Sequence, residues 1–86
     1  MTARLSSSRA VARMFSPLAL FRMARRLRQA DVSRRGGLPS RTVSAIETGV
    51  QPANDEHLRK LCRGLRAKRS DVTRLLSQTR KWASRS

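Results

Sequence analysis

Arginine is the residue type through which this chain can do most of its chemistry. The 86-residue sequence has 20 Lys plus Arg against 5 Asp plus Glu, a formal net charge of +15, and 17 of the 20 basic residues are arginine. A planar guanidinium forms paired hydrogen bonds to a phosphate or to a guanine edge, which a lysine ammonium does less well. Because such a chain repels itself, it requires an anionic partner. The composition therefore favours nucleic acid as the partner.

Residues suited to catalysis or metal binding are scarce. The single histidine, His57, and the single cysteine, Cys62, are five positions apart, a spacing that does not place them on one helix face. Two such ligands would not complete a zinc site, and we interpret Cys62 as a small core residue. The sequence also lacks a glycine-rich phosphate loop. We therefore expect no catalytic residues, no metal, no cofactor, no small-molecule ligand and no enzyme activity.

The five acids have mainly structural explanations. Asp31, Asp55, Glu56 and Asp71 all fall in the first turns of expected helices, where a negative charge complements the helix dipole. Only Glu47 remains, at the end of an expected helix. A lone acid among so many arginines indicates a specific basic partner.

The helices that position these residues follow from capping residues and apolar spacing. Ser16-Pro17 begins the first, Gly36-Gly37 stops the second, Gly49 caps the end of the third, and Asn54 and Ser70 cap the last two. We expect helices at residues 17–26, 29–35, 40–47, 55–65, and from 71 towards 82. Their inward residues should be Leu18, Phe21, Met23 or Ala24, Leu27, Val43, Ile46, Leu58, Leu61, Cys62, Leu65, Val72, Leu75 and Leu76, with Leu38 in the turn before the third helix.

These elements divide the chain into three parts. Residues 1–16 form a basic arm, with a short helix over 8–15 as one option; residues 17–79 form the folded domain; residues 80–86 form a basic tail, frayed from 83. The arm suits DNA binding, although its composition also resembles a mitochondrial transit peptide. Within the domain, residues 29–49 are two short helices around a glycine turn, which is typical of a helix-turn-helix whose second helix enters the DNA major groove.

This segment resembles the helix-turn-helix of the phage Cro and repressor family. The resemblance covers about residues 18–76, and its motif runs without a gap through Leu27, Gln29, Val32, Ser33, Gly37, Leu38, Val43, Ile46, Glu47 and Gly49. It implies an all-α, five-helix, lambda-repressor-like DNA-binding domain with a basic N-terminal extension. It also implies a buried ion pair between Arg22 and Glu47; the alternative is that Glu47 pairs at the surface with any nearby arginine.

The resemblance and the position of each residue imply a set of DNA contacts. Residues at the N-terminal side of the second helix face base edges: Ser40, Arg41, Ser44 and Ala45. Arg41 is the foremost of these, as a guanidinium fork on guanine, with a phosphate contact as the alternative. Gln29 and Thr48 match phosphate-holding positions. Arg28, Arg34 and Arg35 either add phosphate contacts or form a solvated basic face.

Four residues depart from the family pattern. Gly36 stands where an apolar core residue is expected, which should loosen the second helix. Arg26 replaces the glycine between the first two helices, and Arg28 replaces a small polar cap. Pro39 replaces the cap of the recognition helix, which leaves that helix's register open by about one residue.

We therefore expect a sequence-specific double-stranded DNA-binding protein, a small Cro-like transcriptional repressor that acts in the cytoplasm on the nucleoid, with a phage-encoded origin as one option. It should bind as a homodimer on a two-fold operator, through the last helix, with Trp82 favoured as an interface residue over Leu75 and Leu76. The alternatives are an antitoxin-type autoregulator on the same fold, a nucleoid-coating or RNA-binding protein, and a cationic membrane-active peptide. Three aromatic residues are too few for a base-stacking platform, and no apolar run approaches the ~20 residues of a membrane span.

Overall fold

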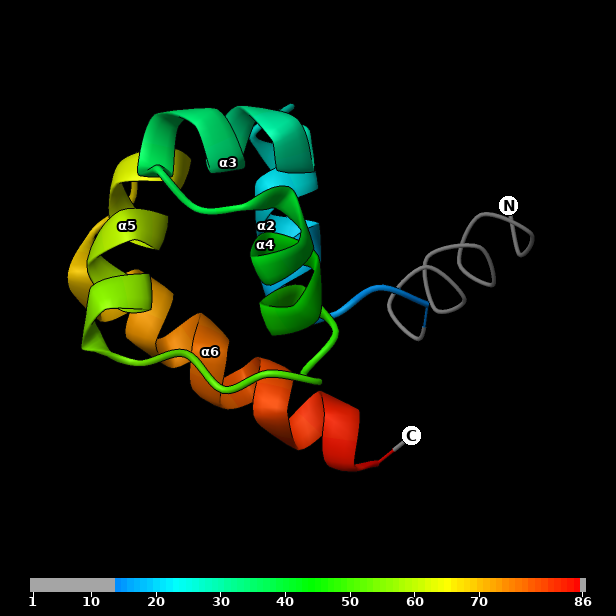
Figure 1. Ribbon diagram of the computed structural model, residues 1–86. Coiled ribbons are helices and arrows are strands. Elements are labelled where there is room, and N and C mark those ends of the chain that lie inside the picture. Colours follow the sequence, from blue (N-terminus) through cyan, green and yellow to red (C-terminus); the bar gives the residue numbers. More distant parts are fainter. Residues whose placement is uncertain (1–13, 86) are drawn as a thin grey trace, which may run out of the picture.

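The computed structural model describes residues 14–85, in which five helices and no strand occur. The helices are α2 (Pro17–Ala24), α3 (Gln29–Gly36), α4 (Ser40–Glu47), α5 (Asp55–Leu65) and α6 (Arg69–Ser84) (Figure 1). The expectation of an all-α, five-helix domain is confirmed. The short helix considered over residues 8–15 falls largely outside the described residues, as does most of the basic arm.

Helix α2 begins where the serine–proline pair predicted, and it is capped from two sides. The Ser16 hydroxyl accepts a hydrogen bond from the Ala19 N–H at 3.1 Å. The hydroxyl of Thr79, on α6, accepts one from the Leu18 N–H, also at 3.1 Å. These are N–H groups that a helix start cannot satisfy internally. The end of α2 differs from the prediction: the helix stops at Ala24, because Arg26 adopts a left-handed conformation with φ of 58°.

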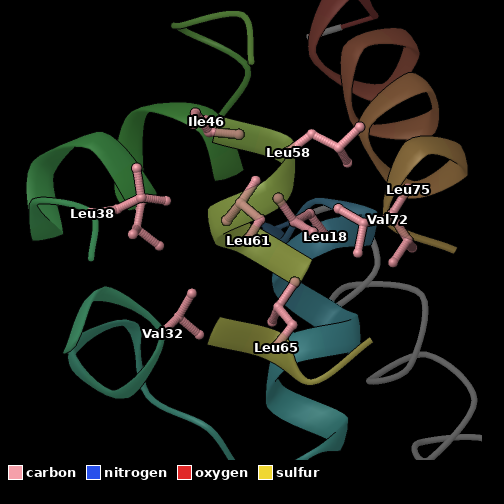
Figure 2. Close-up of a cluster of buried hydrophobic side chains, with 10 residues drawn as sticks. Leu18, Val32, Leu38, Ile46, Leu58, Leu61, Leu65, Val72 and Leu75 are labelled. Carbon is pink, nitrogen blue, oxygen red and sulfur yellow. The ribbon is translucent and has the colours of Figure 1, made fainter. Parts of the chain in front are cut away.

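The buried leucines of α5, Leu58, Leu61 and Leu65, lie in one core cluster with buried side chains from the other helices (Figure 2). Cys62 and Leu76 pack against this core while half-buried, as do Phe21 and Leu27. The expected inward position of Met23 or Ala24 is wrong, since both side chains are exposed where α2 ends. The cluster of buried hydrophobic side chains consists of Leu18, Val32, Leu38, Val43, Ile46, Leu58, Leu61, Leu65, Val72 and Leu75.

Gly36 is buried at the end of α3, so the expectation that it loosens this helix is wrong. A Cβ atom at this position would lie 2.5 Å from the backbone carbonyl oxygen of Lys60 on α5. The missing side chain therefore allows the backbones of α3 and α5 to approach closely.

Helix α6 begins earlier and ends later than predicted. Lys68, not Ser70, occupies its capping position: the Lys68 carbonyl accepts from the Val72 N–H at 3.1 Å, which places Ser70 inside the first turn. The helix then runs to Ser84, so residues 80–84 are helical rather than part of a tail. Buried Thr79 ties this second half of α6 to the start of α2 through its hydrogen bond to Leu18, and Trp82 is half-buried.

Candidate nucleic-acid interface

The C-terminal end of α4 is fixed by the ion pair of Arg22 and Glu47. Arg22 Nε donates to Glu47 Oε2 at 2.6 Å and Arg22 Nη2 donates to Glu47 Oε1 at 3.2 Å, a two-pronged geometry. The third guanidinium nitrogen, Nη1, donates to the Leu27 carbonyl at 2.7 Å. The side chains are 11% and 4% exposed. A buried charge needs both an opposite charge and hydrogen bonds, and each residue supplies these to the other. The pair therefore ties α2 to the end of α4.

Gln29 joins this pair, which the sequence did not reveal. Its Nε2 donates to Glu47 Oε1 at 2.9 Å, although we expected the side chain to hold a phosphate. One of the two amide hydrogens is thereby used within the protein, and one is left. The link connects the first residue of α3 to the last residue of α4, so both helices of the motif share one carboxylate.

The start of α4 resolves the register that Pro39 left open. Pro39 is the N-cap, with φ of −60° and ψ of 144°, and its carbonyl accepts from the Thr42 and Val43 N–H groups at 3.0 and 3.1 Å. Ser40 is therefore the first helical residue. No side chain caps α4, so its positive dipole end and first N–H groups remain available to an anion.

The residues expected to contact bases lie on the outer side of α4. Ser40 and Arg41 are exposed, and Ser44 and Ala45 are half-buried. The inward residues of the same helix, Val43 at 0% and Ile46 at 2% exposure, are in the core. The helix therefore separates a packing face from an outward edge, which we define as Ser40, Arg41, Ser44 and Ala45. Arg41 takes part in none of the ion pairs formed within residues 14–85.

The expected phosphate-contacting arginines at α3 differ in how they are held. Arg28 Nε and Arg34 Nη2 lie 3.5 and 3.1 Å from the carboxylate of Asp31, whereas Arg35 is exposed and outside the ion pairs of the described chain. The Arg28 backbone N–H also donates to Asp31 Oδ2 at 2.8 Å. This hydrogen bond, assisted by the two guanidinium groups, holds the pKa of Asp31 below its ordinary value of 3.8. Asp31 thus stays charged and forms ion pairs with Arg28 at the start of α3 and with Arg34 in its last turn.

Thr48 caps the end of α4 and is exposed, but its hydroxyl turns back onto the helix. Thr48 Oγ1 donates to the carbonyl oxygens of Ser44 and Ala45 at 3.0 and 3.2 Å. Gly49 follows in a left-handed conformation with φ of 77°, so the cap is Thr48 and the glycine is the residue after it. Because a hydroxyl has a single hydrogen, Thr48 must rotate this hydrogen outward before it can donate to a phosphate.

Other kinds of site find no support in the described residues. Within residues 14–85, no three His, Cys, Asp or Glu side chains are grouped so that they could hold a metal ion. In the same range, no helix has the length and apolar character needed to cross a membrane.

The comparisons with known proteins agree with this geometry. The family model described as a helix-turn-helix domain matches residues 17–75, from the first residue of α2 into α6. No curated protein and no solved structure matches the chain. The matched segment contains the α3–turn–α4 unit, the buried pair of Arg22 and Glu47, and the outward edge of α4. The chain therefore belongs to the helix-turn-helix domain family, a family of DNA-binding domains.

Proposed function

We propose that this protein binds specific sequences in double-stranded DNA and regulates transcription as a small Cro-like repressor that occupies its operator, and that it is phage-encoded. In this proposal α4 lies in the major groove, with its N-terminal turn towards the base edges. The protein acts inside a prokaryotic or phage-infected cell, on the nucleoid. The basic arm, residues 1–16, adds contacts to the DNA backbone or minor groove.

The main support for this proposal is the position of Arg41. It is exposed in the first turn of α4 and has no ion-pair partner within residues 14–85, whereas the opposite end of α4 is fixed by hydrogen bonds from Arg22 and Gln29 to Glu47. A rigid helix with an unengaged guanidinium at its tip suits a paired hydrogen bond to guanine O6 and N7. Ser40 and Ser44 supply further polar contacts, and the Ala45 methyl group suits a thymine methyl.

Phosphate contacts orient the motif on the duplex. Exposed Arg28 at the start of α3 and exposed Arg34 and Arg35 in its last turn supply charge, and Gln29 supplies its second amide hydrogen. Thr48 contributes once its hydroxyl hydrogen has rotated. With ~6–10 such contacts, affinity should fall about 10³–10⁵-fold between 50 and 200 mM salt.

The protein binds as a homodimer, with two copies of α4 about one helical turn of DNA apart. The proposed dimer surface is the end of α6, around half-buried Trp82. Leu75 is buried in the core and is therefore excluded from this surface.

The test is a selection from random-sequence duplexes, carried out in parallel with wild-type protein and with Arg41→Ala. The wild type should select one consensus with two-fold symmetry and a guanine in each half-site. Arg41→Ala should lose the guanine preference while it retains salt-dependent binding to DNA. A wild-type selection without any consensus, or an affinity that does not change with salt, would contradict the proposed function.

A further inference from the structure

The described chain places two residues other than glycine in the left-handed region, and both are arginine. Arg26 follows the end of α2 with φ of 58°, and Arg66 follows the end of α5 with φ of 54°. Glycine adopts this conformation without the clash that a Cβ atom causes, and Gly37 and Gly49 occupy the other left-handed positions. The two turns therefore carry long cationic side chains at positions where the backbone conformation favours glycine. A residue retained against its backbone preference is a candidate for a functional role.

Arg25 joins these two turns in space. Its guanidinium carbon lies 4.7 Å from the centroid of the Phe21 ring, and its Nη1 donates to the backbone carbonyl of Arg66 at 3.2 Å. The donor and the acceptor are 41 positions apart in the sequence. The turn between α2 and α3 and the turn between α5 and α6 therefore form one continuous surface.

This surface is strongly positive. Lys68 and Arg69 follow Arg66 and are exposed, as are Arg25 and Arg26. We call these five residues the turn patch: Arg25, Arg26, Arg66, Lys68 and Arg69. None of them takes part in an ion pair within residues 14–85. The ends of α2 and α5 favour nearby cations, but five unneutralised charges repel one another and attract an anion.

We propose that the turn patch binds the phosphate backbone of duplex DNA. This inference rests on the proposed function and extends it, because the turn patch lies outside the helix-turn-helix contacts. Arg26 is two positions before Arg28, which begins the proposed phosphate surface of α3. The turn patch continues that surface onto the turn between α5 and α6. Four of its five residues are arginines, whose guanidinium groups match the geometry of phosphate oxygens.

The test removes charge without disturbing the two turns. Arg26→Gly combined with Arg66→Gly deletes both cations, and glycine accepts the left-handed backbone. The double variant should be at least as heat-stable as the wild type and should select the same consensus. Two contacts are lost per chain and four per bound homodimer, so the slope of log affinity against log salt should fall by about 3.6, since each lost phosphate contact removes about 0.9. Arg26→Asn with Arg66→Asn is the second variant pair, because asparagine also tolerates this conformation.

Arg59→Ala with Arg63→Ala is the matched control, since it removes the same charge from exposed positions on α5 that lie outside the ion pairs within residues 14–85. The turn patch predicts a smaller slope for both turn variants than for this control. Turn variants with the same slope as the control would overturn the turn patch and leave the proposed function standing. If the wild type itself binds no duplex DNA, both proposals fail.

Two duplexes distinguish where the phosphates lie. One ends at the edges of the selected site, and the other carries about two extra helical turns on each side. A slope change confined to the longer duplex assigns the turn patch to phosphates flanking the operator. The same change on both duplexes assigns it to phosphates within the operator.

Discussion

Gly36 of α3 and Gly64 of α5 lie against one another where these helices cross. A Cβ atom on Gly36 would lie 3.6 Å from the Gly64 Cα and 2.5 Å from the Lys60 carbonyl oxygen. A Cβ atom on Gly64 would lie 2.6 Å from the Val32 carbonyl oxygen. Both clashes are with backbone atoms, which cannot rotate away as a side chain can. The pair therefore sets how closely the first helix of the motif packs on the core.

Replacing either glycine by alanine should destabilise the protein. Alanine favours a helix by about 1 kcal/mol over glycine. Overpacking a core, however, typically costs roughly 1–3 kcal/mol. Because the clashes here are with backbone atoms, we expect a cost at or above the upper end of that range. We expect Gly36→Ala and Gly64→Ala each to lower the free energy of unfolding measured in urea. The control is Arg35→Ala, at an exposed position of α3, which should change the free energy of unfolding by less than about 0.5 kcal/mol. Unchanged stability in both glycine variants would contradict the close crossing.

Glu47→Ala should be among the most destabilising single changes. It leaves the nearly buried guanidinium of Arg22 without its counter-charge and removes the acceptor of the Gln29 amide. Breaking one side of such a buried pair costs about 3–5 kcal/mol. In Arg22→Met with Glu47→Leu no charge remains buried, so this double variant should lose less stability than the single variants Arg22→Met and Glu47→Leu together. A double-mutant cycle from thermal melts measures the difference, and strict additivity would show that the two residues are not coupled.

Thr79→Val should destabilise the junction of α2 and α6. The valine side chain has nearly the same shape but lacks the hydroxyl that accepts from the buried Leu18 N–H. An unpaired buried donor costs roughly 1–3 kcal/mol. Thr79→Ser keeps the hydroxyl and loses only a methyl group, so it serves as the control. If valine proved no worse than serine in thermal melts, the hydrogen bond would contribute nothing.

Arg41→Ala should change DNA recognition and leave the fold intact. The side chain is exposed, so stability should shift by less than about 0.5 kcal/mol. Loss of a paired contact to guanine should remove about 1–3 kcal/mol of discrimination between the selected site and one with that base changed. Competition binding with the two duplexes measures this. Equal loss of affinity for both duplexes would instead assign Arg41 to a phosphate.

Stability should decline in acid through two carboxylates. The Arg28 N–H lowers the pKa of Asp31 below 3.8, and the Lys60 side chain lowers the pKa of Glu56 below 4.5. Because both groups bind protons less readily when folded, their contribution is complete above these ordinary values and is lost as pH falls through the folded-state values. Melting temperatures from pH 7 to 2 should therefore fall below about pH 4.5. Asp31→Asn should show a smaller fall, and superimposable profiles would rule out Asp31 as a contributor.

The sequence by itself determined which five segments are helical and how α4 divides into two faces, although the end of α2 and both ends of α6 were misplaced. Ser16-Pro17, Asn54 and Gly37 mark helix ends through bonds to residues a few positions away, so they can be recognised locally. The apolar spacing of Val43 and Ile46 likewise shows which side of α4 is buried. The family resemblance added the pair of Arg22 and Glu47, which no spacing rule within a helix could provide.

Only the tertiary structure decided the roles of Gly36, Gln29 and Thr79. Gly36 looked like a defect in an apolar pattern until α5 was placed beside it. Gln29 reaches Glu47 across 18 positions and Thr79 reaches Leu18 across 61. Such partners depend on helix crossing angles and separations, which local periodicity does not record. The same reason explains the turn patch: two strained arginines far apart in sequence become one surface only when the ends of α2 and α5 meet.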